Sequence, residues 1–447
     1  MGKKIMFILL VGLILLSVVP AEETKSVRAT RKWVKQNGHS ILQDFTHLLS
    51  MPNVASNRKN IRNNAEYISN LFQKRGFDMQ LLELEGANPI VYGEYKVPGA
   101  IRTLCFYVHY DGQPVDPTKW AHGPFTPVLY SGAMDGGGKP IALPSRGDKI
   151  DPEWRIYGRS AGDDKAPIIT ILNAVDALQS SKIGFTSNIK LFFEGEEEAG
   201  STNLKAHLLN NKNLLDDIDI WLFCDGPVHQ SRRPQLVFGV RGVTGMEVTV
   251  YGATRALHSG HYGNWAPVPG QMLARLIASM KNEDGKVLIE NFYDTVEPLS
   301  EFERLELAKI PNVDMQLKNE LGLAFTEGEG RTINERLLLP SLTIKGLASG
   351  NVGKKARNVI PNTATTAIGV RLVKGNDPED MLDKVESHIR KQGYHIVYTE
   401  PDMETRLKYR KIAKVDRRGS GYIASRTSMQ EPHAKTIINA VRNFVSD

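Results

Sequence analysis

The chain has 447 residues, which is more than one ordinary hydrophobic core accommodates and predicts two or three domains. Hydrophobic residues make up 41% and charged residues 24%, fractions that are typical of a soluble globular protein and exclude a low-complexity chain. The formal net charge of +6 is a weak bias for this length, so it gives no reason to expect a nucleic-acid partner.

The N-terminus has the pattern of a signal peptide over residues 1–21. Lys3 and Lys4 precede an apolar stretch, residues 5–19, that is shorter than the ~20 residues needed to span a bilayer. Val19 and Ala21 place small residues where a cleavage site after Ala21 requires them. We therefore expect a secreted or periplasmic protein without a stable membrane anchor, and an uncleaved anchor helix is the alternative.

From about residue 28 to 240, short apolar strands alternate with longer amphipathic segments. Helices are expected at 62–76, 166–181 and 202–211, and strands at 103–111, 188–193 and 218–226. Continuous apolar strands that alternate with helices predict an α/β domain with a mainly parallel sheet and helices on both faces. Cys105 and Cys224 lie in two of the apolar runs and are expected to be buried free thiols.

The pattern changes after residue 242. A strand at 245–253, a helix at 266–280, strands at 340–347 and 363–373, a helix at 377–393 and a strand at 395–400 follow one another. This βαββαβ order predicts a ferredoxin-like domain inserted in the larger one. Residues 281–339 are expected to be irregular, and the basic stretch 406–418 to be a solvated loop before a last helix at 431–445.

Polar side chains follow three of the predicted buried strands. His109 and Asp111 end the first strand, a cluster of four glutamates within residues 194–198 ends the second, and Asp225 ends the third. Asp163 lies in the loop before helix 166–181. Ligands of α/β sheets bind at the carboxyl ends of the strands, so these side chains are expected to meet at one edge.

Histidine nitrogen and carboxylate oxygen are donors that suit zinc, with manganese or cobalt as alternatives. The excess of carboxylates favours two divalent metal ions over one. Each signal also has a structural alternative: a hydrogen-bonded histidine, a solvated glutamate run, or a turn at Asp225.

Five motifs, in their order along the chain, resemble the dinuclear zinc metallopeptidases that include carnosine dipeptidases, glutamate carboxypeptidases and aminoacylases. They are HYDGQPVDPTKW (109–120), GPFTP (123–127), YGRSAGDDKAP (157–167), FEGEEEAGS (193–201) and CDG (224–226). HYDGQP and LHSGHYGN (257–264) are most similar to the dipeptidase branch. The resemblance implies a catalytic domain over 22–240, a lid and dimerisation domain over 241–396, a return to the catalytic domain over 397–447, and a homodimer.

The same resemblance implies a role for each matched residue of the catalytic domain. His109 and Asp225 would bind the first metal ion, Asp163 would bridge both ions, and Glu198 would bind the second. Glu197 would be the general base, taking a proton from a water between the metals and passing it to the leaving amine. Asp111 would orient His109.

Two further residues are implied in the lid. His258 matches a residue that reaches across the dimer to stabilise the tetrahedral oxyanion, and Arg371 matches one that binds the substrate carboxylate. A guanidinium fork suits a carboxylate, so the chemistry of Arg371 agrees with that role.

The function implied is metal-dependent hydrolysis of dipeptides or short peptides. An N-acyl amino acid amidohydrolase would use the same site and is one alternative. Family members continue past the helix matching 433–444 with a Gly-Gly-Ser/Thr segment and a late histidine that binds the second metal, and neither is found in this sequence. A truncated or non-catalytic member of the family is therefore another alternative.

Overall fold

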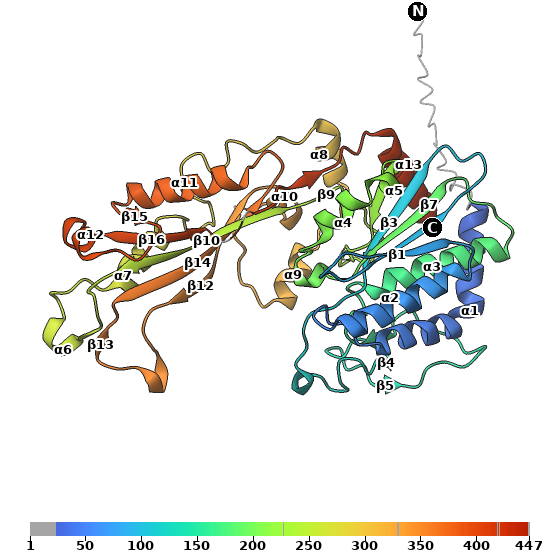
Figure 1. The fold of residues 1–447 in the computed structure, drawn as a ribbon, viewed down its shortest axis with the longest axis horizontal. Coiled ribbons are helices and arrows are strands. Elements are labelled where there is room, and N and C mark those ends of the chain that lie inside the picture. The colour runs from blue at the N-terminus through green and yellow to red at the C-terminus, as the bar shows by residue number, and fades with distance from the viewer. Residues whose placement is uncertain (1–23, 227, 329, 418, 420, 446–447) are drawn as a thin grey trace, which may run out of the picture. The chain divides into compact units, whose positions relative to one another are not determined.

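The computed structural model describes residues 24–226, 228–328, 330–417, 419 and 421–445, and the expected signal peptide over 1–21 lies outside the described residues. The chain divides into two compact units, residues 1–227 with 435–447 and residues 228–434 (Figure 1). The sequence placed the corresponding boundaries after residues 240 and 396. Over the described ranges, no helix is both long and apolar enough to cross a bilayer.

The first unit is built on a five-stranded sheet in the order β1-β2-β7-β3-β8. Its strands are β1 (Asp78–Leu82), β2 (Ile90–Tyr95), β3 (Thr103–His109), β7 (Asn188–Glu194) and β8 (Ile220–Phe223). Strands β7, β3 and β8 run parallel, as the sequence predicts, whereas β2 and β1 extend one edge antiparallel. The sequence did not predict β1 or β2, because β1 is an edge strand with mostly partly exposed side chains and lacks a continuous apolar run.

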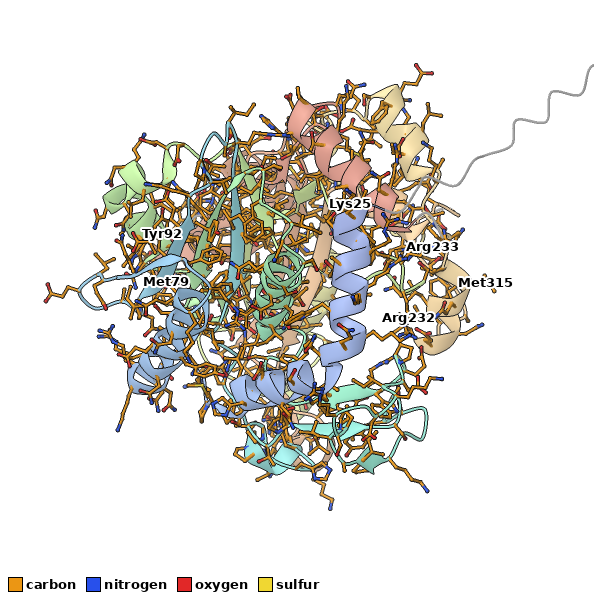
Figure 2. The ribbon with its side chains drawn as sticks, turned by 90° about the vertical axis from the view of Figure 1, so that its right-hand side faces the viewer. Lys25, Met79, Tyr92, Arg232, Arg233 and Met315 are labelled. Carbon is orange, nitrogen blue, oxygen red and sulfur yellow. The ribbon has the colours of Figure 1, made fainter. Side chains whose placement is uncertain are left out.

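Helices cover both faces of this sheet, which confirms the predicted arrangement. One core joins Val108, Leu191 and Phe193 of the sheet to α1 (Lys25–Ser50), α2 (Arg58–Gln73) and α3 (Lys165–Ser180). On the other face, Tyr92, Cys105 and Phe192 pack with α4 (Leu204–Asn210) and α5 (Lys212–Leu215). Figure 2 draws these packed side chains and labels Met79 and Tyr92. Cys105 and Cys224 are free thiols, as expected; Cys105 is buried and Cys224 partly buried.

Smaller elements complete the first unit. A three-stranded sheet of order β5-β4-β6 is formed by β4 (Val128–Tyr130), β5 (Pro140–Ile141) and β6 (Arg155–Tyr157). Two 3-10 turns, η1 (Pro117–Lys119) and η2 (Glu197–Ala199), follow β3 and β7 along the chain. The described part of the last helix, α13 (Pro432–Val445), contacts α1 where the Arg31 guanidinium lies 5.2 Å from the Phe444 ring centre.

The second unit contains another five-stranded sheet, in the order β12-β14-β10-β16-β15. Its strands are β10 (Gly242–Tyr251), β12 (Ser341–Ala348), β14 (Thr363–Leu372), β15 (His395–Val397) and β16 (Ile412–Arg417). Helices α7 (Pro269–Ala278) and α11 (Pro378–Lys391) pack on one face through a core that includes Val248, Leu273 and Val385. The predicted βαββαβ order is present as β10-α7-β12-β14-α11-β15.

The prediction of a solvated loop at 406–418 was wrong. Residues 412–417 form β16, which inserts between β10 and β15, and α12 (Met403–Lys408) precedes it. Ile412, Ala413 and Val415 are buried, whereas Lys414 lies on the other face of the sheet. The high content of lysine and arginine concealed this alternation, because long basic side chains can extend to solvent from a strand that is buried on one face.

The prediction that residues 281–339 are irregular was also wrong in part. It contains α8 (Glu301–Leu307), α9 (Asp314–Glu320) and α10 (Ile333–Leu337). Capping boxes begin two of these helices, with Ser300 and Glu303 at α8 and Thr332 and Glu335 at α10. Reciprocal bonds of this kind satisfy backbone donors at a helix start, and the Ser/Thr-x-x-Glu spacing was a signal available in the sequence.

Short paired elements complete the second unit. They are β9 (Gly239–Val240) with β17 (Ser425–Arg426), β11 (Leu257–His258) with β13 (Val359–Ile360), α6 (Ser259–Tyr262) and η3 (Gly353–Lys355).

Because Lys165 at the start of α3 is buried, we expect its contribution to the free energy of unfolding to depend on pH. Its ammonium donates to the carbonyls of Leu48 (2.9 Å) and Met51 (3.0 Å) at the end of α1, and burial lowers its pKa to about 7. An unfolded lysine keeps its proton up to about pH 10.4, so the unfolded state binds more protons than the folded state between these values. The stability due to Lys165 therefore rises with pH, by on the order of 3 kcal/mol from pH 7 to 9.5.

Urea unfolding at several pH values measures this slope. His109 and Asp164, whose pKa values are raised, contribute the opposite slope to every variant, so the quantity compared is the wild-type stability minus that of Lys165→Met. We expect this difference to increase from pH 7 to 9.5, while Lys205→Met, at an exposed lysine of α4, should follow the wild type. An equal slope in the wild-type and Lys165→Met chains would contradict the assignment.

Candidate metal centre

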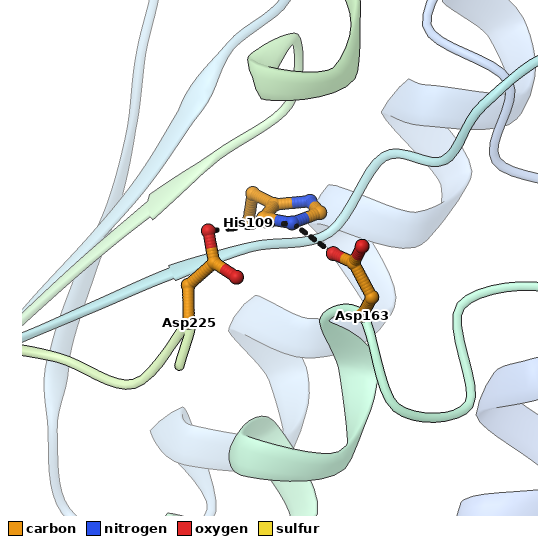
Figure 3. Close-up of side chains that lie close together, drawn as sticks. All are labelled: His109, Asp163 and Asp225. Atoms are coloured by element: carbon orange, nitrogen blue, oxygen red, sulfur yellow. Dashed lines mark hydrogen bonds and ion pairs between the residues drawn. The ribbon is translucent and has the colours of Figure 1, made fainter. Parts of the chain in front are cut away.

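The ends of the parallel strands bring three potential metal ligands together. His109 is the last residue of β3, Asp225 follows β8 by two residues, and Asp163 lies in the loop before α3. One donor atom of each lies within 4.8 Å of the donors of the other two (Figure 3). The parallel pairing of β3 with β8 places His109 and Asp225 at the same edge, as the sequence predicted.

His109 is the centre of this cluster and is fully buried. Its Nε2 lies 2.7 Å from Asp163 Oδ1, 3.9 Å from Asp225 Oδ2 and 3.8 Å from Glu197 Oε2. The Asp163 side chain is 70% exposed, whereas Asp225 and Glu197 are each 37% exposed. One face of the cluster is therefore open to solvent and can admit a small ligand.

Burial and neighbouring charges shift the pKa values of the side chains in this cluster. Burial disfavours an imidazolium at His109, but the carboxylates of Asp111, Asp164 and Asp225 outweigh burial and raise the pKa of His109 to about 10. Burial also raises the pKa of Asp225 and Glu197, although His109 opposes both shifts, and raises that of Asp164 to about 8. A divalent cation would compensate the crowded negative charge, and one nitrogen with several carboxylate oxygens is a donor set that fits zinc.

Asp111 connects the histidine to the glutamate loop. It is fully buried, and its Oδ1 lies 3.4 Å from His109 Nδ1. The same carboxylate accepts the backbone N–H of Glu197 (3.1 Å) and of Glu198 (3.0 Å). Asp111 therefore links η2 to the end of β3. From this position it can orient both the imidazole of His109 and the backbone of Glu197.

The four glutamates after β7 have different environments. Glu194 is buried and accepts a 2.6 Å hydrogen bond from the Tyr107 hydroxyl. Glu196 accepts the backbone N–H of Asn203 (3.0 Å) and, at 3.4 Å, that of Asn88. Both side chains are buried in the scaffold. Glu194 is opposite His109 in the β3–β7 ladder, but the carboxylate within ion-pair distance of the His109 ring is that of Glu197, at 3.8 Å. Glu198 Oε2 accepts a 2.5 Å bond from the Gln113 side-chain amide.

The remaining residues named from the sequence are located as follows. Glu198 does not belong to the cluster of His109, Asp163 and Asp225. His258 and Arg371 lie in the second unit and are exposed, and His258 Nδ1 accepts the backbone N–H of Gly260.

Two residues at the centre were not singled out from the sequence. Asp164 is buried, and its Oδ2 accepts the backbone N–H of His109 at 3.3 Å. Tyr107 reaches Glu194 from a position two residues before His109 on β3. Strand periodicity gave a signal for Tyr107, because alternate residues of a strand share a face.

Replacing Asp111 with asparagine should weaken metal binding. The asparagine amide group cannot accept both backbone N–H groups that the carboxylate accepts, so His109 and η2 lose a common support. Loss of such an outer partner typically costs about 10–100-fold in metal affinity. Zinc competition with a chromophoric chelator measures the effect.

Asp219→Asn is a matched control for this measurement. Asp219 also accepts a backbone N–H, that of Thr103, at the opposite end of the sheet. We expect this variant to lose stability without losing zinc affinity. Equal zinc affinities of Asp111→Asn and wild type would contradict the positioning role.

Comparisons with known proteins find relatives in sequence and in structure. Residues 238–397 match the family described as "Peptidase dimerisation domain". The chain is 26% identical over 363 residues to the Cys-Gly metallodipeptidase dug1 of Schizosaccharomyces pombe, covering 78% of this chain and 72% of that protein. It is 28% identical over 308 residues to the Beta-Ala-His dipeptidase of Mus musculus, covering 67% of this chain and 58% of that protein.

A solved structure is similar over most of the chain. The M20 family metallo-carboxypeptidase Sso-CP2 from Sulfolobus solfataricus superimposes with a TM-score of 0.67 at 27% identity, covering 90% of this chain and 83% of that chain. The chain therefore shares its fold with this structure and contains a segment that matches the dimerisation domain.

Proposed function

The chain belongs to the M20 family of metallopeptidases, and on this premise we propose that it hydrolyses dipeptides at the cluster of His109, Asp163 and Asp225. The observation that carries the proposal is the convergence of one buried imidazole and two carboxylates at the carboxyl ends of parallel strands. Relatives named as Cys-Gly and Beta-Ala-His dipeptidases support dipeptides as the substrate class.

We propose a pair of zinc ions as the cofactor, and the cluster of His109, Asp163 and Asp225 supports one of the two sites. His109 and Asp225 would hold one ion, Glu198 would hold the other, and Asp163 would contact both. Zinc supplies Lewis-acid chemistry when bound, since it polarises a carbonyl and makes water a stronger acid. Manganese and cobalt accept the same donors and are the alternatives.

Glu197 is the proposed general base. Its carboxylate is partly exposed, lies 3.8 Å from His109 Nε2, and has a pKa that burial raises. A pKa closer to the working pH improves the compromise between accepting a proton and releasing it. Glu197 would take a proton from the attacking water and deliver it to the nitrogen of the leaving amine.

The second unit is proposed to bind substrate and to form a homodimer. The exposed Arg371 would bind the α-carboxylate of the peptide, and His258 would stabilise the oxyanion in the site of the partner subunit. Residues 1–21 would direct export, which makes the active form a secreted or periplasmic enzyme.

A substrate comparison tests the proposal. The purified chain with added zinc or manganese should hydrolyse L-alanyl-L-alanine, and a chelator should abolish the hydrolysis until metal is restored. N-acetyl-L-alanine serves as the matched substrate for an amidohydrolase. Faster hydrolysis of N-acetyl-L-alanine would overturn the dipeptidase assignment, and no metal-dependent hydrolysis of either would overturn the enzymatic one.

A further inference from the structure

The second unit contains a pocket of about 330 Å³ at one end of its sheet. Three segments form its walls: the end of β10 with Gly252, Pro267 before α7, and residues 406–410 with Ile412, which lead from α12 into β16 (Figure 1). All of these residues belong to the second unit, so this unit builds the whole pocket. Protein pockets of this size hold small organic molecules.

The pocket is positively charged. Arg406, Lys408 and Arg410 line it, and none of its lining residues is acidic. None of the three cations forms an ion pair within the part of the chain that the structure describes. The carboxylate of Glu400 interacts with Arg406 through space, but it is already bonded to the Lys414 ammonium and to the Tyr251 hydroxyl. The pocket therefore has positive charge that no carboxylate neutralises.

Uncharged groups hold Arg406 in place. Its Nε donates to the carbonyl of Pro401 (3.2 Å) and its Nη1 to the carbonyl of Gly252 (3.2 Å). Its guanidinium carbon lies 4.9 Å from the ring centre of Tyr251. Its Nη2 forms no hydrogen bond among the described residues. A guanidinium fixed in this way keeps its full charge and loses little conformational freedom when an anion binds.

A second part of the wall combines a fixed ring with apolar surface. The Tyr409 ring stacks on His395, with ring centres 3.5 Å apart and planes 2° from parallel, and the Lys408 ammonium lies 5.4 Å from the Tyr409 ring centre. Leu407 also lines the pocket and is 83% exposed. An exposed leucine beside cations favours a ligand that carries an apolar part next to its negative charge.

The cations near the end of α12 also have a structural explanation, because positive charge is favourable at a helix C-terminus. This explanation fits Lys408, the last residue of the helix. It does not account for Arg410, which lies two residues beyond α12, or for Arg406, whose Nη1 donates to a carbonyl 154 positions away in the chain. Two of the three cations are thus placed for another reason.

We propose that this pocket binds an organic phosphate, with the phosphate group on Arg406, Lys408 and Arg410 and the apolar part against Leu407 and Pro267. Guanidinium forks match phosphate oxygens in pairs, and an ammonium adds a compact charge. A phosphate monoester carries a charge of about −1.5 to −2 at neutral pH, which three cations compensate and which exceeds that of a carboxylate. None of the residues of this pocket belongs to the metal centre, and the inference does not depend on the proposed hydrolysis.

Isothermal titration calorimetry of the zinc-loaded full chain tests the pocket. We expect phenyl phosphate to bind at least about tenfold more tightly than benzoate, which has the same ring and a single charge. Arg406→Met should weaken binding of phenyl phosphate by about 10–100-fold, and Arg406→Lys should retain part of the affinity. Arg410→Met should weaken it by about three- to tenfold.

A soluble phosphate ester and a lipid headgroup present the same chemistry, and sedimentation with vesicles separates them. The vesicles consist of phosphatidylcholine with or without phosphatidate, a lipid whose headgroup is a phosphate monoester. Binding to phosphatidate vesicles that Arg406→Met removes supports the pocket with a lipid as its ligand. Binding of phenyl phosphate without vesicle binding supports the pocket with a soluble ester.

Arg357→Met is the matched control. Arg357 is an exposed arginine of the same unit whose Nη1 also donates to backbone carbonyls, those of Lys354 (3.2 Å) and Ala356 (2.8 Å), but it does not line the pocket. This variant should bind phenyl phosphate as the wild type does. If thermal unfolding shows that Arg406→Met is not folded, Arg410→Met decides, because Arg410 forms no hydrogen bond with the described residues.

The metal centre is the competing site, because zinc also binds phosphate oxygens. Equal affinity for phenyl phosphate in the wild type and in the folded Arg406→Met variant would assign the ligand to that centre and overturn the proposal. Absence of binding to both phenyl phosphate and phosphatidate vesicles would overturn it as well.

Discussion

Replacing Glu197 with glutamine should lower kcat for dipeptide hydrolysis by about 10²–10⁴-fold, with little change in KM. Glutamine has the same shape as glutamate but cannot accept a proton from the attacking water at neutral pH. The backbone N–H of residue 197 would still donate to Asp111, so the position of η2 should be preserved. Steady-state kinetics with saturating zinc measure the loss, and thermal unfolding checks that the variant is folded.

Glu196→Gln is the matched control for this variant. Glu196 is the preceding residue and carries the same side chain, but its oxygens accept the backbone N–H groups of Asn203 and Asn88. Its amide would support the scaffold less well, at a cost of about 1–3 kcal/mol in unfolding free energy. We expect kcat to stay within about threefold of wild type, because the reacting proton is not transferred through Glu196. Glu197→Gln activity equal to that of Glu196→Gln would exclude Glu197 as the base.

Zinc binding to the metal-free chain at pH 7 should release one to two protons. His109 has a pKa near 10 and carries a proton at pH 7, but a ligand nitrogen must be free of it. Asp164, with a pKa near 8, also holds a proton at pH 7, and a nearby cation would favour its release. The zinc affinity due to His109 alone should fall about tenfold for each pH unit below 10.

Calorimetric titrations in two buffers of different ionisation enthalpy count the released protons. His109→Ala removes the nitrogen ligand and should weaken zinc binding by more than about 100-fold, since outer partners alone account for about 10–100-fold. His47→Ala, at an exposed histidine of α1, should bind zinc and release protons as the wild type does. Proton release that is independent of His109 would show that the imidazole is not a ligand.

The sequence predicted some strands and helices of the fold and missed others. The strands β3, β7 and β8 were predicted because each is a continuous apolar run, which is a local property. Strand β16 was not predicted, because its burial depends on insertion between β10 and β15 and its composition is strongly basic. Helices α8 and α10 were not predicted, because their stretch of sequence has no strong apolar periodicity. Their capping boxes were the local signals from which they could have been predicted.

The candidate centre was predicted in part. Strand ends identified His109 and Asp225 because parallel strands carry their carboxyl ends to one edge. The sequence did not show which of the four glutamates lies near the histidine, because this depends on the fold. The side chains of Glu194 and Glu196 are hydrogen-bonded within the first unit, whereas the Glu197 carboxylate lies near His109. The contact between Arg406 and Gly252 joins residues that are 154 positions apart, and no local pattern of the sequence predicts it.

The sequence by itself determined the α/β class, the βαββαβ order of the second unit and the residue types at the ends of the parallel strands. These follow from periodicity and from motifs, which are read within about ten neighbouring residues. Only the tertiary structure decided the protonation of His109, the separate environments of the glutamates and the pocket around Arg406. The physical reason is that burial, charge and hydrogen bonding act through space, between side chains that no local pattern brings together.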